Sequence, residues 1–423
     1  MEAQVINKQL NLMQISISMM LMLSIFSANA QGSWVQKADW TGCYAQSNTA
    51  VSVGDKAYVG LGTAYCRDWI EFDPVNNTWT AMDTLPSPYS ETVMAFGIND
   101  KAYVLTSGGY INNNNSTYDY QNELWEYDPS TGDWTYLNNL PTNPVNQGAS
   151  FSINGKGYIV GGSVPSVIGT FSIQLWEYDP LNNTWTNKAP YIGVPANCQV
   201  AFVIDGIAYV GGGMTSGSVI PSEFYKYNPT NNQWSQIATC PKTELFAASA
   251  FAINGKGYVG MGLSLGTTEN PHYVWEYNPL ADEWNRVEDL PDNQCMWDEG
   301  VGFSINGKGY MGLGDVTCNQ LPMGYYPYIY EYTPETNSVN TIEDNMENVK
   351  VFPTISSGNF QIIVDNQTTN DFIYEIRDIQ GKIITNGKGV KEKNINMIGN
   401  CPGMYLIVVK INDKMSTHKV FIN

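Results

Sequence analysis

Three carboxylates and one guanidinium are the side chains of this chain best suited to chemistry. Glu91, Asp298 and Glu299 could serve as general acids or bases, because a carboxyl group held close to a substrate exchanges protons with it. Arg67 could anchor an anionic group through its planar guanidinium. Carboxylates alone do not single out a reaction, so these residues indicate a ligand site and leave open whether that site is catalytic.

Other kinds of catalytic centre find little support in the sequence. The chain has two histidines, His272 and His418, and it contains no histidine-rich metal motif and no glycine-rich phosphate loop. We interpret His272 as an ordinary loop residue. We therefore expect no bound metal and no cofactor.

A repeat of 45 to 55 residues positions the candidate side chains. In the copy that runs from Phe151 to Trp185, Asn154-Gly155 favours a two-residue hairpin turn, and a second turn precedes the tryptophan. Four short strands make a sheet that cannot bury both of its faces alone, so the copies must stack. Two series of aromatic residues each count six copies: Tyr58, Tyr103, Tyr158, Tyr209, Tyr258 and Tyr310, and Trp34, Trp79, Trp134, Trp185, Trp234 and Trp284.

The sixth copy needs a strand from elsewhere in the chain. Trp34 precedes the first tyrosine, whereas Val339 occupies the seventh tryptophan position. We expect Trp34 to Asp39 to supply the outer strand of the sixth copy. That strand would join the first and last copies into a closed ring and remove an exposed sheet edge. The alternative is a final strand from Ser338 to Ile342.

These motifs resemble the kelch family over roughly residues 33 to 340. Its paired glycines recur as Gly108-Gly109, Gly161-Gly162 and Gly211-Gly212, and they loosen to GLG or GMG at Gly60, Gly260 and Gly312. A second motif recurs as FDP at 72, YDP at 127 and 178, YNP at 227 and 277, and YTP at 332. The resemblance implies a six-bladed β-propeller over residues 31–334, with the tyrosines and tryptophans packed between blades. Kelch-type copper oxidases use paired histidine and tyrosine ligands, which this chain lacks.

Turn lengths divide such a propeller into two faces. The turn between the first and second strand is tight in every copy, so the short turns share one face and the longer loops lie together on the other. The longest loop runs from Thr106 to Glu123 and contains Tyr110, Tyr118 and Tyr120. Long loops on a rigid scaffold usually carry function, so we expect the ligand on the long-loop face.

Polar residues recur where the innermost strand of each copy begins. The residues twelve positions before the repeated tyrosines are Gln46, Glu91, Asn146, Asn197, Phe246 and Asp298, and Gln147 and Glu299 follow two of them. Such a ring at the mouth of a central channel could hold a sugar or a peptide through converging hydrogen bonds, or it could only hydrate the channel. Together with Arg67 and Trp297, these residues are the candidate ligand site.

The first thirty residues predict export. Residues 1–30 combine Lys8, an apolar run from Ile15 to Phe26 and the sequence Ala28-Asn-Ala30. This pattern predicts a secretory signal peptide cleaved after Ala30 rather than a membrane anchor, because the apolar run is short and no second hydrophobic span follows.

The C-terminal part of the chain has a different pattern of strands and turns. After a polar linker at residues 335–348, residues 349–423 resemble the type A C-terminal sorting domain of type IX secretion substrates, a small immunoglobulin-like β-sandwich. The matching features are Pro353, Ser357-Gly358, Phe360, Gly381-Lys382, Gly403-Met-Tyr405 and Lys419-Val420-Phe421. The usual Tyr-Pro-Asn-Pro start is Phe352-Pro353-Thr354-Ile355 here. The resemblance implies passage across the outer membrane by the secretion machinery; the alternative is an accessory carbohydrate-binding sandwich.

Cysteine spacing follows the repeat in two copies. Cys43 lies fifteen residues before Tyr58 and Cys66 lies eight after it, and Cys295 and Cys318 have the same offsets from Tyr310. Equal offsets mean equal positions, so we predict the disulfides Cys43–Cys66 and Cys295–Cys318, both on the long-loop face. Pairing of Cys198 with Cys240 is open, and Cys401 would then remain a thiol.

Charge separates the two parts of the exported chain. Residues 31–345 hold 11 Lys or Arg against 32 Asp or Glu, a net charge of −21, whereas residues 346–423 hold 9 against 7, a net charge of +2. An acidic domain of this kind argues against nucleic acid and anionic membranes as partners.

The sequence thus predicts an all-β chain: a six-bladed kelch-type β-propeller followed by a small immunoglobulin-like β-sandwich. We expect a secreted or cell-surface monomer without a membrane span, which binds a glycan or a protein through its long-loop face. The alternative is a carbohydrate-active enzyme, of mutarotase or lyase type, that uses the carboxylates at the channel mouth.

Overall fold

The computed structural model describes residues 32–43, 47–62, 66–91, 93–110, 118–167, 169–243, 245–263, 272–291, 295–318, 324–325, 327–334, 349–353, 355–356, 358–364, 371–378, 383–398, 403–411 and 414–422. Strands are the only regular secondary structure in these residues, and they include no helix that could cross a membrane. The chain divides into two compact units after Pro334. The predicted signal peptide (1–30), the linker (335–348), the alternative strand Ser338 to Ile342 and Cys401 lie outside the described residues.

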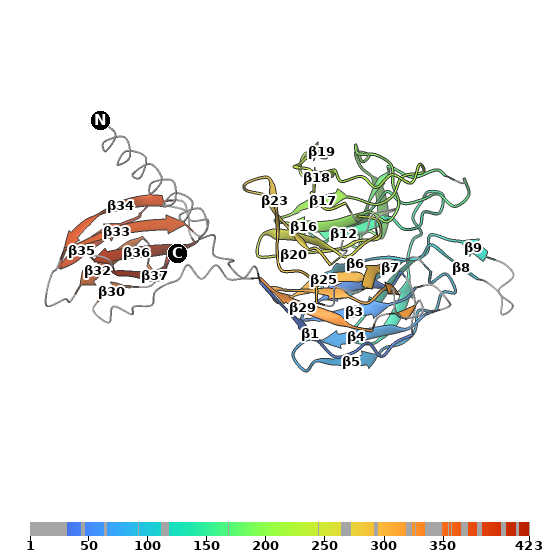
Figure 1. Ribbon diagram of the computed structural model, residues 1–423, viewed down its shortest axis with the longest axis horizontal. Coiled ribbons are helices and arrows are strands. Elements are labelled where there is room, and N and C mark those ends of the chain that lie inside the picture. The colour runs from blue at the N-terminus through green and yellow to red at the C-terminus, as the bar shows by residue number, and fades with distance from the viewer. Residues whose placement is uncertain are drawn as a thin grey trace, which may run out of the picture. The chain divides into compact units, whose positions relative to one another are not determined.

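The first unit contains six four-stranded antiparallel sheets, or blades (Figure 1). From the innermost to the outermost strand, the first three blades are β2 (Thr49–Val53), β3 (Lys56–Gly60), β4 (Trp69–Asp73), β5 (Thr78–Ala81); β6 (Met94–Ile98), β7 (Lys101–Leu105), β10 (Leu124–Asp128), β11 (Asp133–Tyr136); and β12 (Ala149–Ile153), β13 (Lys156–Val160), β14 (Leu175–Asp179), β15 (Thr184–Asn187). The last three are β16 (Val200–Ile204), β17 (Ile207–Gly211), β18 (Phe224–Asn228), β19 (Gln233–Gln236); β20 (Ser249–Ile253), β21 (Lys256–Gly260), β22 (Trp275–Asn278), β23 (Glu283–Arg286); and β25 (Val301–Ile305), β26 (Lys308–Gly312), β29 (Ile329–Thr333), β1 (Ser33–Gln36).

The six blades form a closed ring. Each innermost strand contacts the innermost strand of the next blade, in the order β2, β6, β12, β16, β20, β25 and back to β2. The N-terminal strand β1 pairs with β29, with Trp34 opposite Tyr332, so it is the outer strand of the sixth blade. This confirms the predicted closure and leaves the sixth blade as complete as the others.

Aromatic residues fill the spaces between blades, and the repeated tryptophans add a hydrogen bond. In every blade the indole Nε1 donates to a main-chain carbonyl in the segment that leaves the preceding blade, at 2.8 to 3.0 Å. Trp185, for example, donates to Asn138 and packs against Tyr178 with ring centroids 5.0 Å apart. These contacts tie each blade to its neighbour, so the ring is rigid at its perimeter.

Extra strands stand on the long-loop face of two blades. The loop after β7 forms a hairpin, β8 (Gly108–Tyr110) and β9 (Tyr118–Tyr120), which projects from the ring (Figure 1). In the sixth blade, β24 (Cys295–Asp298), β27 (Asp315–Cys318) and β28 (Gly324–Tyr325) form a small sheet. The long-loop face, where we expect the ligand to bind, therefore carries additional strands.

The second unit is a separate β-structure with its own core. Its strands are β30 (Val349–Phe352), β31 (Ile355–Ser356), β32 (Asn359–Val364), β33 (Asp371–Asp378), β34 (Ile383–Val390), β35 (Glu392–Asn396), β36 (Gly403–Ile411) and β37 (Lys414–Ile422). They follow the order β30-β32-β35-β34-β33-β36-β37-β31, in which β34 and β35 share a single residue pair. Ile362, Ile376 and Ile407 are fully buried in its core. The immunoglobulin-like topology of this unit stays a prediction.

Candidate functional site

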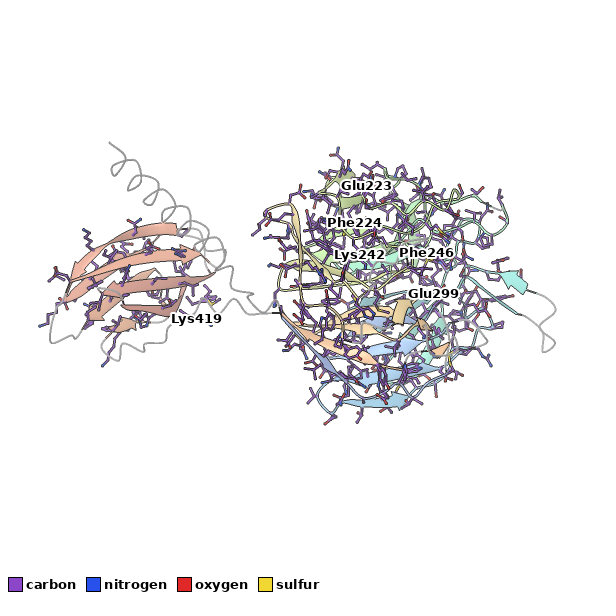
Figure 2. All side chains as sticks on the ribbon, viewed as in Figure 1. Glu223, Phe224, Lys242, Phe246, Glu299 and Lys419 are labelled. Carbon is purple, nitrogen blue, oxygen red and sulfur yellow. A yellow bond between two sulfur atoms is a disulfide. The ribbon has the colours of Figure 1, made fainter. Side chains whose placement is uncertain are left out.

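A polar cavity of about 130 Å³ lies where the innermost strands begin. Its lining comes from the leading segments of all six blades: Ser47, Asn48, Val93, Gln147, Gly148, Cys198, Gln199, Ala247, Ala248, Glu299 and Gly300. Because every blade contributes, the cavity lies at the axis of the ring. Glu299, labelled in Figure 2, is the carboxylate among these lining residues.

The backbone takes the same unusual conformation around this cavity. The residue two positions before the innermost strand has a φ of 51° to 55° in five blades: Ser47, Gln147, Cys198, Ala247 and Glu299. This left-handed conformation is disfavoured for residues other than glycine and costs on the order of 1 kcal/mol or more at each position. Such strain persists only where the surroundings impose it, and it turns the chain from the loop into the strand at the cavity wall.

Hydrogen bonds connect these residues from blade to blade. The Cys198 N–H donates to the Gln147 carbonyl at 2.7 Å, and the Glu299 N–H donates to the Ala247 carbonyl at 3.1 Å. The Ser47 hydroxyl donates to the Glu299 carboxylate at 3.0 Å, which joins the first blade to the last. These bonds join the third blade to the fourth, the fifth to the sixth and the sixth to the first at the mouth.

The side chains of Asn197 and Gln199 at this mouth have buried polar atoms without a hydrogen bond within the described residues. The Asn197 side chain donates through Nδ2 to Gln147 at 2.8 Å, but its Oδ1 is buried without a donor. Gln199 lines the cavity and is 6% exposed, and both its Oε1 and its Nε2 are buried without a hydrogen-bond partner in the described part of the chain. An unpaired buried polar group costs roughly 1–3 kcal/mol, so these two amides favour a ligand or water that forms hydrogen bonds at the mouth.

The structure shifts the predicted ring by one residue. Glu91, Asn146, Asn197 and Phe246, twelve positions before the repeated tyrosines, instead form backbone bridges to Gly108, Ser163, Met214 and Leu263. The cavity is lined instead by the residues that follow them, which have the left-handed backbone conformation. Gln147 and Glu299 were predicted and do line the cavity; Ser47, Cys198 and Ala247 were missed. A count of eleven rather than twelve would have found them.

The other predicted residues lie away from the cavity or outside the description. Arg67 is exposed on the loop before β4, and its carbonyl accepts a hydrogen bond from the Leu85 N–H. Gln46 lies outside the described residues. Trp297 and Asp298 belong to β24, whose side chains are not described. The described residues thus bring together Gln147, Asn197 and Glu299 from the predicted set.

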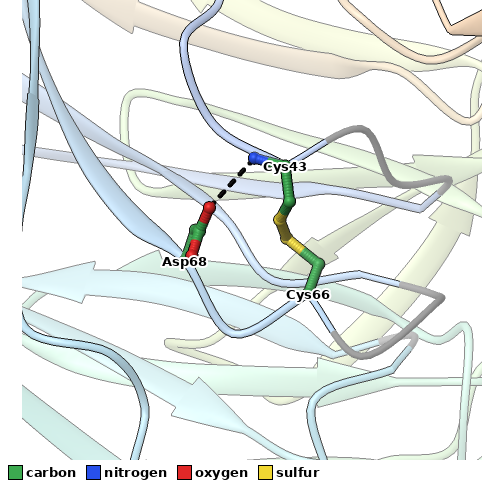
Figure 3. Close-up of side chains that lie close together, drawn as sticks. All are labelled: Cys43, Cys66 and Asp68. Atoms are coloured by element: carbon green, nitrogen blue, oxygen red, sulfur yellow. Dashed lines mark hydrogen bonds between the residues drawn. A yellow bond between two sulfur atoms is a disulfide. The ribbon is translucent and has the colours of Figure 1, made fainter.

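A disulfide stiffens the rim of the first blade (Figure 3). Cys43 is bonded to Cys66, the pair that the repeat register predicts, with their Cα atoms 6.0 Å apart. The Asp68 carboxylate accepts a hydrogen bond from the Cys43 N–H at 2.9 Å, and the Trp40 indole donates to the Cys43 carbonyl. The leading loop of the blade is thereby tied to the loop between its second and third strands.

The remaining described cysteines support the second predicted disulfide and answer the open question about Cys198 and Cys240. Cys295 on β24 stands directly opposite Cys318 on β27, so the backbone register agrees with the predicted second disulfide. Cys198 and Cys240 are not bonded to each other. They lie in different places, because Cys198 lines the axial cavity whereas Cys240 is in the apolar core with Phe224 and Leu245.

Comparison with known proteins agrees with this architecture. Residues 47–262, just over half of the chain, match the family described as the KLHDC2/KLHL20/DRC7 Kelch-repeats domain. The chain belongs to the kelch-repeat family. Its six blades are therefore kelch blades, as the glycine and tyrosine motifs predict.

Individual relatives of this kelch propeller are N-acetylneuraminate epimerases. The protein of Pasteurella multocida (strain Pm70) is 27% identical over 178 residues, which cover 33% of this chain and 46% of that protein. The protein of Shigella sonnei (strain Ss046) is 29% identical over 164 residues, which cover 38% and 42%. The chain thus matches less than half the length of these curated relatives.

A solved structure supports the fold of the whole ring. The structure titled "Structure of YjhT" aligns with a TM-score of 0.59 at 17% sequence identity, and covers 70% of this chain and 97% of that one. At this identity the likeness establishes the shared fold and nothing about chemistry.

Chemically, the kelch mouth is better equipped for hydrogen bonding than for proton transfer. Among the described lining residues, Glu299 supplies the single carboxylate, and amides and one hydroxyl surround it. General acid–base catalysis usually needs a proton donor and an acceptor on opposite sides of the reacting atoms. The described groups can hold a hydroxyl-rich ligand without moving its protons.

Proposed function

We propose that the kelch propeller binds a glycan at its axial mouth. The observation that carries this proposal is the convergence of the Glu299 carboxylate and the Gln147 and Gln199 amides on one cavity. Sugar hydroxyls donate hydrogen bonds, and a preorganised set of acceptors is how proteins hold them. The relatives add support, since they are named as epimerases of a sugar, N-acetylneuraminate.

The size of the cavity restricts what enters it. A volume of about 130 Å³ is well below the roughly 300–1,000 Å³ of a pocket that encloses a whole ligand. We therefore propose that one sugar unit, or part of it, is held at the axis while the rest of the glycan lies on the loop face. The disulfide at Cys43–Cys66 keeps this face preorganised, which reduces the entropy lost on binding.

A glycan array followed by calorimetric titration tests the proposal. Glu299→Gln, which preserves shape and removes charge, should weaken binding of the best glycan by about tenfold or more, because hydrogen bonds to charged groups contribute roughly 1.5–3 kcal/mol. Asp55→Asn, on an exposed tight turn of the opposite face, is the matched control and should bind normally. Absence of any glycan ligand, or equal affinity of the Glu299 variant, would refute it.

A second candidate function is sugar mutarotation, favoured by the names of the relatives. Here Glu299 would shuttle a proton at the anomeric centre, helped by a group that the described lining does not supply. Anomer exchange of N-acetylneuraminate, followed by NMR with and without the protein, separates the candidates. Acceleration that disappears in Glu299→Gln would establish the enzyme; binding without acceleration would leave the binding function.

We also propose that the second unit is a sorting signal for export and does not form part of the ligand site. Its independent core supports this, as does its resemblance to type IX sorting domains. On this proposal the chain crosses the periplasm and the outer membrane with the secretion machinery as partner, and works as a secreted or surface-attached monomer. Removing residues 346–423 should leave the propeller folded and abolish export. An unfolded propeller, or export without the tail, would contradict the proposal.

A further inference from the structure

In five of the six blades, side chains of the second and third strands form a polar cluster. In each, the repeated tyrosine on the second strand donates its hydroxyl to a glutamate directly opposite on the third strand, at 2.5 to 2.8 Å. The pairs are Tyr58–Glu71, Tyr103–Glu126, Tyr158–Glu177, Tyr258–Glu276 and Tyr310–Glu331.

A lysine completes each of these clusters. The five glutamates pair with Lys56, Lys101, Lys188, Lys256 and Lys37 in the same order. The carboxylate therefore always stands between a phenol and an ammonium group. That arrangement satisfies the charge of the carboxylate and the hydroxyl of a largely buried tyrosine at once.

The fourth blade lacks the carboxylate. Tyr209 stands opposite Lys226 instead of a glutamate. Ile207 occupies the first position of the second strand, where the other five blades have lysine. The fourth blade thus keeps the phenol and an ammonium group but has an apolar side chain and no acid at the equivalent positions.

The fourth blade has a pocket of about 290 Å³ at the positions where it differs from the other blades. It is lined by Ile207, Tyr209, Lys226, Asn228, Asn231, Gln233, Trp234 and Ser235. These residues lie next to the tight turns at Asp205-Gly206 and at residues 229–232, so the pocket opens on the short-turn face, away from the axial mouth. Its volume is close to the lower end of the range for ligand pockets and suits a single sugar ring.

We propose that this pocket of the fourth blade binds a carboxylate-bearing sugar. The ligand's carboxylate takes the place that glutamate occupies in the other blades, where it accepts from the Tyr209 hydroxyl and pairs with the Lys226 ammonium. The side chains of Asn231, Gln233 and Ser235 line the same pocket and meet the sugar's hydroxyl groups.

The neighbouring acids do not neutralise Lys226. Asp282 is close enough for its charge to act on Lys226, but its carboxylate accepts from the Ala238 N–H and the Tyr277 hydroxyl, and the two side chains form no ion pair among the described residues. Asp205, on the adjacent turn, is exposed and well solvated. The ammonium is therefore available, although these two carboxylates will keep the affinity moderate.

Calorimetric titration of the full-length protein with glucuronate tests the proposal, with glucose and glutamate as comparison ligands. Glucuronate should bind in a saturable manner, and both comparison ligands should bind at least about tenfold more weakly, because each lacks one half of the recognised chemistry. Lys226→Glu restores the carboxylate of the other five blades and should abolish glucuronate binding. Lys226→Gln should weaken it by about tenfold, as expected for loss of a charged hydrogen bond.

Lys388→Glu is the matched charge reversal, on an exposed strand residue of the second unit, and should leave binding unchanged. Equal melting temperatures of the variants would show that they are folded. Glucose binding as tightly as glucuronate, or full binding by Lys226→Glu, would overturn the assignment. Tighter binding of glutamate than of glucuronate would mean an acidic peptide site and would overturn it as well.

Discussion

The hydroxyl of Tyr127 is buried without a hydrogen-bond partner because the residue five positions later is Gly132. In the next three blades the same tyrosine donates to a side chain at that place: Tyr178 to Asn183 at 3.0 Å, Tyr227 to Asn232 at 2.8 Å and Tyr277 to Asp282 at 2.8 Å. Each acceptor has a left-handed backbone, with φ between 49° and 55°. Gly132 also has a left-handed backbone, with a φ of 80°, but it has no side chain that could accept a hydrogen bond.

Gly132→Asn should therefore stabilise the propeller. A Cβ atom at this position would meet nothing within 4 Å, and asparagine tolerates the left-handed conformation. The new side chain would accept from Tyr127 and raise the free energy of unfolding by about 1 kcal/mol. Urea denaturation measures the gain. In a double-mutant cycle, Tyr127→Phe should cost stability only beside Asn at 132; equal costs in both backgrounds would contradict the explanation.

Removal of the N-terminal strand should open the ring. Trp34 contacts Tyr332 and Phe251, and its indole donates to the Glu288 carbonyl. Deleting residues 31–39 removes these contacts and exposes the edge of β29, so the free energy of unfolding should fall by at least about 3 kcal/mol, the usual cost of losing one packed tryptophan. Thermal unfolding followed by circular dichroism measures the loss. A deletion variant that melts within a degree or two of the parent would rule out a stabilising role for this strand.

Alkaline pH should unfold the propeller cooperatively. Burial raises the pKa of Tyr127, Tyr178 and Tyr227 to about 12 from the ordinary value of 10.0. Because the folded state holds these protons more tightly, the stabilisation is complete below pH 10 and is lost as the pH rises from about 10 towards 12. Tyrosinate absorbance and circular dichroism should change together in this range. Tyrosines that ionise near pH 10 while the sheets persist would contradict the prediction.

The sequence was informative where one side chain type recurs at one position. The tyrosine and tryptophan series predicted six blades and the role of Trp34, because packing between blades demands a large aromatic residue in each copy. The axial ring was missed by one position because its residues share a backbone conformation instead. Ser47, Cys198 and Ala247 have no side chain property in common, so no pattern of residue types could reveal the left-handed turn that aims them at the axis.

The pocket of the fourth blade was missed for the opposite reason. A repeat is recognised from the residues that recur in every copy. This pocket instead depends on Ile207 and Lys226, which replace the lysine and the glutamate of the other five blades. Pairing register was needed to recognise that Lys226 stands where the other blades have glutamate.

The second disulfide prediction concerns the sixth blade. Cys295 and Cys318 are directly opposite across an antiparallel pair, where Cα atoms are roughly 4.5–5.5 Å apart, within the range that a disulfide spans. With the bond at Cys43–Cys66, the rims of two adjacent blades would both be cross-linked on the long-loop face. Each bond should stabilise the propeller by about 3 kcal/mol in the chain-entropy model.

Non-reducing peptide mapping of the secreted protein should find Cys43 joined to Cys66 and Cys295 joined to Cys318. The double variant Cys295→Ser/Cys318→Ser should lower the melting temperature and weaken glycan binding at the axial mouth, because Glu299 directly follows β24. Cys240→Ser is the control, since Cys240 is buried in the apolar core away from the mouth, and it should affect stability without affecting affinity. Two thiols at Cys295 and Cys318, or a partner other than Cys66 for Cys43, would contradict the equal-register argument.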